Sequence, residues 1–120
     1  MADKPTIVVA TNNSGKLKEF ALLLPNFKII SQSSLNITPE EELGETFFEN
    51  SLQKARVANN ASGMVSLGDD SGLIIPALNN LPGLRSARYA HENATDEENR
   101  QHLRKELEAL DLNQTKAYFV

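Results

Sequence analysis

The sequence contains no cysteine and no tryptophan, and only 6% of its residues are aromatic. Without cysteine there are no disulfides, no thiolate metal ligands and no thiol nucleophile. The aromatic residues are too few and too scattered to form a platform on which nucleic-acid bases stack. No apolar run approaches the roughly 20 residues of a membrane-spanning helix, and the first residues lack the apolar core of a signal peptide. These absences predict a soluble, cytoplasmic protein without a membrane partner.

An excess of positive charge is also lacking. Sixteen acidic residues stand against twelve basic ones, which gives a net charge of −4. A protein that coats nucleic acid must neutralise a run of phosphates, and this composition does not supply the cations. We therefore expect no nucleic-acid partner. If the protein binds phosphate, a few well-placed cations must do so, with a metal ion to offset the acidic side chains.

A chain of 120 residues has the length of one domain, and its 40% hydrophobic and 23% charged residues are ordinary for a globular protein. Short apolar runs alternate with helical patterns, which predicts an α/β domain with a mixed β-sheet flanked by helices. A helical stripe runs from Leu17 to Leu24, and capping boxes at Thr46 and Thr95 begin two more helices. The expected strands are residues 6–10, 27–30, 65–67, 73–75 and 116–120, with 86–90 also extended; the two capped helices are 46–61 and 95–110.

The first candidate site is the polar turn between the first strand and the first helix. A turn that opens a helix offers unpaired backbone N–H groups and the positive end of a dipole, which bind anions. Lys16 lies in the first helical turn, where a cation is unfavourable without a negative partner. The turn is not a Walker A loop, since Ala10 and Leu17 stand where that loop needs Gly and Ser or Thr. An ordinary cap by Asn13 or Ser14, with Lys16 in water, is equally compatible with the spacing.

The second candidate site is acidic. Asp69 and Asp70 lie between two apolar strands, and Glu40, Glu41 and Glu42 lie in the loop before the second helix. Two adjacent carboxylates at a strand end, joined by one from a loop, suit Mg²⁺, which could bind a polyphosphate and activate water. On these residues alone, ordinary turn chemistry is the preferred explanation. The cost of placing like charges between buried strands keeps the metal site as an alternative.

The third candidate is Lys54, which shares one face of the helix 46–61 with apolar residues and Asn50. A face that mixes apolar side chains with one cation and one amide suits the wall of a cleft. A lysine that extends from the edge of the apolar face into water is the simpler alternative. His91 and His102 have no metal-like spacing, and we expect both on the surface.

The order of the motifs is more specific than any one of them. Thr-x-Asn-x-x-Lys begins at Thr11, and Glu-x-Gly-x-Thr-Phe-x-Glu-Asn begins at Glu42. Asp-Asp-Ser-Gly-Leu follows from Asp69, and Pro-Gly-x-x-Ser-Ala-Arg-Tyr from Pro82. In this order, and over essentially the whole chain, the motifs resemble those of the Ham1 family, the inosine triphosphatase-like pyrophosphatases.

The resemblance implies an enzyme that hydrolyses inosine, deoxyinosine and xanthosine triphosphates to the monophosphate and pyrophosphate, with Mg²⁺. We also expect a homodimer, which would cover an exposed edge of the sheet. The resemblance implies that Asp70 accepts the proton of the attacking water. The implied metal ligands are Glu41, Glu42, Asp69 and Asp70, and of the two glutamates Glu42 fits the spacing to Gly44 better. The implied substrate-binding residues are Thr11, Asn12, Asn13, Ser14, Gly15, Lys16, Lys54 and Ser71.

The chain departs from the family pattern in a few places. Gly68 and Ser51 stand where alanine is common, and Arg85 stands where tyrosine is common. The resemblance also ends about two thirds of the way through the family. We therefore expect residues 1–120 to be the N-terminal two thirds of a single inosine triphosphatase-like domain, without the base-recognition segment, and weakly active or inactive alone. The alternatives are a pyrophosphatase for modified pyrimidine triphosphates and a non-catalytic fragment that binds nucleotides or oligomerises.

Overall fold

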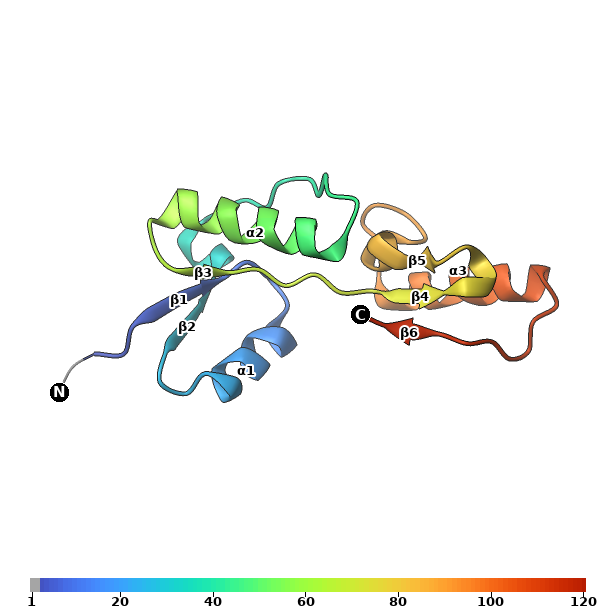
Figure 1. Ribbon diagram of the computed structural model, residues 1–120, viewed down its shortest axis with the longest axis horizontal. Coiled ribbons are helices and arrows are strands. Elements are labelled where there is room, and N and C mark those ends of the chain that lie inside the picture. Colours follow the sequence, from blue (N-terminus) through green and yellow to red (C-terminus); the bar gives the residue numbers. More distant parts are fainter. Residues whose placement is uncertain (1–2) are drawn as a thin grey trace. The chain divides into compact units, whose positions relative to one another are not determined.

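The computed structural model describes residues 3–120, which form two compact units, one ending at Asp70 and one beginning at Ser71 (Figure 1). Each unit contains three hydrogen-bonded strands together with helices. The predicted α/β class with parallel and antiparallel strands is confirmed. Hydrogen bonding divides these strands between a parallel sheet in the first unit and an antiparallel sheet in the second.

The first unit is a parallel sheet with a helix on each side (Figure 1). Its core is β1, in which Val8 and Val9 are completely buried, as expected for a strand that is apolar on both faces. The middle of α2 packs against this strand through the buried Ala58. The elements in chain order are β1 (Thr6–Val9), α1 (Ser14–Leu23), β2 (Lys28–Ser31), the 3₁₀ helix η1 (Gln32–Leu35), α2 (Phe47–Ser62) and β3 (Ser66–Leu67).

The strand order of this sheet is β2-β1-β3, with all neighbours parallel. The chain leaves β1 toward one neighbour and later returns to its other side, so the carboxyl ends of all three strands lie at one edge. In open α/β sheets, ligands bind beside this edge, where the strand order reverses. The segments at this edge begin at Ala10 after β1, at Gln32 after β2 and at Gly68 after β3.

The second unit is an antiparallel sheet in which β4 is the central strand. Ile75 at the end of β4 and Leu78 just after it are buried. Its elements are β4 (Leu73–Ile75), the 3₁₀ helix η2 (Pro76–Leu78), β5 (Leu81–Pro82), the 3₁₀ helix η3 (Gly83–Arg88), α3 (Asp96–Ala109) and β6 (Tyr118–Phe119). No helix within residues 3–120 is long and apolar enough to cross a lipid bilayer.

One strand prediction is wrong, because residues up to Arg88 form η3 where residues 86–90 were expected to be extended. Gly83 has a φ of 54°, which turns the chain as β5 ends. The hydroxyl of Ser86 donates to the Gly83 carbonyl and accepts from the Leu73 N–H, which closes the turn locally. A serine that bonds the carbonyl three residues earlier favours a tight helical turn over a strand.

The predicted helix starts are confirmed at their caps. Thr95 and Glu98 form both hydrogen bonds of a capping box at the start of α3. Thr46 caps α2 by accepting from the Glu49 N–H, but the Glu49 carboxylate reaches the N–H of Glu45 instead of Thr46, so the second half of that box is shifted by one residue.

The two histidines lie in the second unit and outside any metal-like cluster of residues 3–120. His91 is exposed as expected, and its ring contacts the Glu98 carboxylate. This contact is the largest cause that lowers the pKa of Glu98 to about 2. The expectation for His102 is only partly right, because its ring is half-buried and packs edge-on against Tyr89 with the ring centroids 4.8 Å apart.

Candidate active site

The turn after β1 forms a capped helix start. The side-chain oxygen of Asn13 accepts hydrogen bonds from the backbone N–H groups of Gly15 and Lys16, at 2.9 and 3.1 Å. The Thr11 hydroxyl oxygen in turn accepts from the Asn13 N–H at 3.1 Å. Asn13, one of the two capping residues that the sequence suggested, is therefore the N-cap of α1. An anion at this turn would contact the exposed polar groups around the cap or displace the Asn13 amide.

Lys16 does not extend into water. Its ammonium nitrogen lies 2.6 Å from a carboxylate oxygen of Asp69, which comes from the segment after β3. A cation in the first turn of a helix is unfavourable without a negative partner, and Asp69 is that partner. Both side chains remain about one third exposed, so the pair lies open to solvent at the carboxyl edge of the parallel sheet.

Lys54 on α2 is the centre of the site. Its ammonium nitrogen lies 2.8 Å from a carboxylate oxygen of Glu42 and 3.1 Å from Oδ1 of Asp70. It also donates to the backbone carbonyl of Asp69 at 3.2 Å. The side chain is thus held on one side by the loop before α2 that carries Glu40, Glu41 and Glu42, called the acidic loop below, and on the other by the segment after β3. This is a different arrangement from a lysine that reaches out to solvent.

The charge of this lysine is maintained by its partners. Burial lowers the pKa of Lys54, whereas the hydrogen bonds and negative charges of Glu42 and Asp70 raise it, and the net pKa lies above the ordinary 10.5. Lys54 is therefore protonated at neutral pH and partly neutralises two carboxylates.

Asp70 is the most buried acid of the site, with 8% of its side chain exposed. Its Oδ1 contacts Lys54, while its Oδ2 is sealed from solvent and has no hydrogen-bond partner in residues 3–120. A buried carboxylate oxygen without a partner is costly and is rare in folded proteins outside functional sites. This oxygen therefore keeps a hydrogen-bonding capacity that no residue within 3–120 uses.

The structure distinguishes the two glutamates that the sequence left open. Glu42 lies against Lys54 with 16% of its side chain exposed. Glu41 is exposed, and it contributes its backbone carbonyl to the neighbouring helix rather than its carboxylate to the site. Within residues 3–120, no three side chains of the metal-binding types are grouped closely enough to enclose an ion.

Side chains of α2 hold the acidic loop in place. The Gln53 side chain accepts from the Leu43 N–H at 3.0 Å and donates to the Glu41 carbonyl at 2.6 Å. The buried Asn50 accepts from the Gly44 N–H at 2.7 Å. A Cβ at Gly44 would lie only 2.4 Å from this Asn50 oxygen, so only glycine fits there. Gln53 and Asn50 thus fix the backbone on both sides of Glu42.

Two of the departures from the family pattern lie in contact with each other. A Cβ at Gly68 would lie 2.0 Å from the backbone carbonyl oxygen of Ser51 and 2.9 Å from the Ala55 nitrogen. The missing side chain lets the segment after β3 approach α2 closely. That close approach is what brings the Asp70 carboxylate within reach of Lys54 on the same helix.

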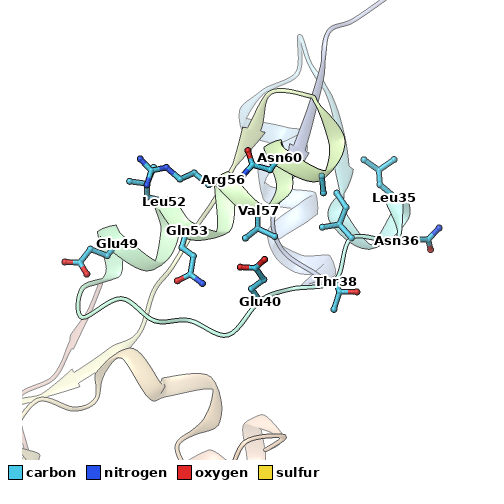
Figure 2. Close-up of a pocket in the computed structure, with 12 residues that line it drawn as sticks. Leu35, Asn36, Thr38, Glu40, Glu49, Leu52, Gln53, Arg56, Val57 and Asn60 are labelled. Atoms are coloured by element: carbon cyan, nitrogen blue, oxygen red, sulfur yellow. The ribbon is translucent and has the colours of Figure 1, made fainter.

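The loop that carries the glutamates borders two hollows of the first unit. A cavity of about 200 Å³ lies beside the turn after β1, and an open groove of about 810 Å³ runs along α2. Glu40, Gln53 and Val57 line both, and Figure 2 shows Glu40 on the loop opposite Gln53 and Val57 on the helix. The cavity is lined by Ala10, Thr11, Asn12, Gln32, Pro39, Glu40, Glu42, Gln53, Lys54 and Val57.

The remaining predicted residues are placed as follows. Asn12 lines the cavity, and Ser14 is exposed as the first residue of α1. Ser71 is half-buried and begins the second unit. The prediction missed Gln53 and Gln32. Both are amides beside predicted site segments, but nothing local to either residue in the sequence indicates its role.

Together, these features define an α/β protein with cations and carboxylates gathered at the carboxyl edge of a parallel sheet, a class of site that suits phosphorylated ligands. Residues 7–120 match the sequence model of the Ham1 family. The chain belongs to the Ham1 family.

Relatives of known sequence and structure agree with this assignment. A "dITP/XTP pyrophosphatase" of Haemophilus influenzae is 49% identical over 98% of this chain and 61% of its own length. A second "dITP/XTP pyrophosphatase", from Geobacter sulfurreducens, is 47% identical over 94% of this chain and 58% of its own length. The solved Ham1 protein of Coxiella burnetii has a TM-score of 0.84 and 45% identity, covering 96% of this chain and 59% of that one. The chain thus spans about 60% of the length of the relatives it matches.

Replacing Lys54 by methionine tests the central ion pairs through their pH dependence. We expect the free energy of unfolding at pH 7 to fall by about 1–3 kcal/mol, because Glu42 and Asp70 lose their shared cation. The folded-state pKa of Lys54 is raised, so its contribution is complete below its unfolded pKa and is lost as the pH rises through the folded value. The difference between wild type and variant should therefore shrink above about pH 10.5 in urea unfolding experiments.

Lys18→Met, at an exposed lysine of α1, is the matched control and should leave the free energy of unfolding almost unchanged. A deficit of the Lys54 variant that stays constant to about pH 11.5 would contradict the assignment of the charge to Lys54.

Replacing Gln53 by methionine should release the acidic loop. The side chain keeps its length but loses both hydrogen bonds, so we expect the Leu43 amide proton to exchange about two- to tenfold faster with solvent deuterium. The measurement is residue-resolved hydrogen exchange by NMR. Gln101→Met, at an exposed glutamine of α3, should not alter this amide. Equal Leu43 exchange in wild type and the Gln53 variant would show that the loop is held by other contacts.

Proposed function

We propose that this protein is a nucleoside triphosphate pyrophosphatase that acts on deoxyinosine, inosine and xanthosine triphosphates and so keeps these non-standard purines out of nucleic acid. The proposal is carried by Asp70, a buried carboxylate with one oxygen on Lys54 and the other unpaired at the carboxyl edge of the sheet. The relatives named as dITP/XTP pyrophosphatases support the choice of substrate.

In the proposed reaction, a water molecule attacks the α-phosphorus and the bond from that phosphorus to the bridging oxygen of the β-phosphate breaks. The products are the nucleoside monophosphate and pyrophosphate. Asp70 takes the proton of the water on its unpaired Oδ2, and Lys54 on the other oxygen keeps the carboxylate oriented. Lys16 and Lys54 offset the negative charge that develops on the leaving pyrophosphate.

We also propose that the site uses Mg²⁺. Mg²⁺ commonly binds through one or two carboxylates, several waters and the phosphates of the substrate, and it does not need an all-protein cage. Such a site could be formed by Asp70 and Glu42, which both contact the Lys54 ammonium, together with the nearby Asp69. The unpaired Asp70 oxygen is a suitable ligand atom. When bound, the ion would neutralise phosphate charge. Glu41 would join this set only if its side chain turned inward.

In the same proposal, the turn after β1 binds the triphosphate, and Ser71 lies beside the substrate. The binding residues of the turn are Thr11, Asn12, Asn13, Ser14, Gly15 and Lys16. It also includes a homodimer and a cytoplasmic location. The mass of the protein in solution by light scattering tests the dimer independently of activity.

Asp70→Asn tests the proposed reaction. The amide keeps the shape of the side chain but cannot accept the proton, so pyrophosphate release should fall at least about 100-fold. The measurement is single-turnover release with protein in excess, with Mg²⁺ and each of deoxyinosine, xanthosine, uridine and adenosine triphosphates. The first two should react faster than the last two.

The matched control is Asp111→Asn, at an exposed acid just after α3, which should leave the rate unchanged. Equal turnover by wild type and the Asp70 variant would contradict an enzymatic role for this site. Faster release from uridine triphosphate would instead indicate a pyrophosphatase for modified pyrimidines. Binding without release by the wild type would favour a non-catalytic nucleotide-binding protein.

A further inference from the structure

Gln32 is a buried residue whose side-chain amide has no partner in the part of the chain that the structure describes. The residue is only 5% exposed, and its side chain makes no hydrogen bond within residues 3–120. Its backbone carbonyl is used, because it accepts from the Ile37 N–H at 3.1 Å. A buried primary amide normally pairs both its N–H donors and its carbonyl oxygen, since leaving them unpaired costs free energy. The side chain of Gln32 therefore has unused hydrogen-bonding capacity.

Gln32 lines the cavity of about 200 Å³ at the carboxyl edge of the parallel sheet. The register of β1 and β2 pairs Val9 with Ser31, so Gln32 follows β2 at the level where the turn after β1 begins. Asp70 Oδ2 is the one side-chain polar atom of residues 3–120 that is both unpaired and sealed from solvent, so the Gln32 amide keeps contact with solvent. Because Gln32 lines the cavity, that contact is with the cavity.

The other polar groups of this cavity indicate what would satisfy the amide. Lys54 brings a cation, and Thr11 and Asn12 bring a hydroxyl and a second amide. The Glu40 and Glu42 carboxylates also line the cavity; Glu42 lies against the Lys54 ammonium, and Glu40 is exposed. The hydroxyl and amide donors of the cavity match a ligand with several acceptor oxygens, such as a phosphate group whose charge Lys54 and a metal ion on the carboxylates would offset.

We propose that Gln32 is a further substrate-binding residue, whose side-chain N–H donates to a phosphate oxygen of the nucleoside triphosphate. The inference rests on the proposed function, because it places the triphosphate in this cavity. Gln32 follows β2, so the proposal adds a substrate-binding residue from a strand end that none of the sequence motifs covers. Segments after all three strands of the parallel sheet then contribute to the proposed site from the same edge.

The test uses two substitutions and one phosphate probe. Gln32→Met keeps the length of the side chain and removes both polar atoms, and Gln32→Glu keeps its shape and adds a negative charge. The probe is inorganic tripolyphosphate, titrated calorimetrically into the full 120-residue chain with Mg²⁺. We expect Gln32→Met to weaken binding roughly tenfold, the loss of one hydrogen bond to a charged group, and Gln32→Glu to weaken it further. Gln114→Met, at an exposed glutamine, should bind as the wild type does.

The thermal midpoint of each variant without ligand separates binding from folding. We expect Gln32→Met to unfold close to the wild-type midpoint, because the side chain that it replaces makes no hydrogen bond within residues 3–120. A lowered midpoint together with weaker binding in both variants would show a structural role and overturn the inference. So would failure of both variants to fold.

The remaining outcomes separate the inference from the function on which it rests. If the wild type binds tripolyphosphate and both Gln32 variants bind it equally well, the inference is overturned while the proposed function stands. If the wild type does not bind tripolyphosphate at all, the phosphate site itself is contradicted, and the role of Gln32 is contradicted with it.

Discussion

The ammonium group of Lys54 is the contact on which the rest of the site depends. It joins a carboxylate from the acidic loop to a carboxylate from the segment after β3, at 2.8 and 3.1 Å. Without a shared cation, two largely buried negative charges this close would repel each other, and the loop and the strand end would separate. The helix that carries Lys54 also carries Asn50 and Gln53, which hold the loop backbone. One helix therefore both attracts the acidic groups and fixes the chain that presents them.

The sheet explains why these groups meet. Because β1 lies between two parallel neighbours, the segments after all three strands emerge at one edge. Lys16 and Asp69 meet there from two different segments, and the small Gly68 lets the strand end approach α2. The unpaired oxygen of Asp70 and the unpaired amide of Gln32 lie in this same region of the first unit. Within residues 3–120, the one sealed side-chain oxygen without a partner lies where phosphate is expected, which is consistent with a site that a ligand completes.

The sequence predicted those parts of the structure that depend on neighbours three or four residues away. The caps at Asn13, Thr46 and Thr95 and the buried strand β1 are of this kind. Contacts between residues far apart in the chain had no local signal. Gln53 bonds to residues 10 and 12 positions away, and Lys54 to a carboxylate 16 positions away. The separation of the strands into two sheets, and the amide of Gln32 beside the turn after β1, depend on strand order, which no local pattern encodes.

The central claim is that Lys54 and Asp70 act as a unit in one phosphate-binding site. A double-mutant cycle with Lys54→Met, Asp70→Asn and the double variant tests this most directly, with the affinity for inorganic tripolyphosphate as the measured quantity. Residues that act as a unit should show a coupling free energy of about 0.5–3 kcal/mol. Single-variant effects that add to within about 0.3–0.5 kcal/mol would mean that the two side chains act independently, and would contradict the claim.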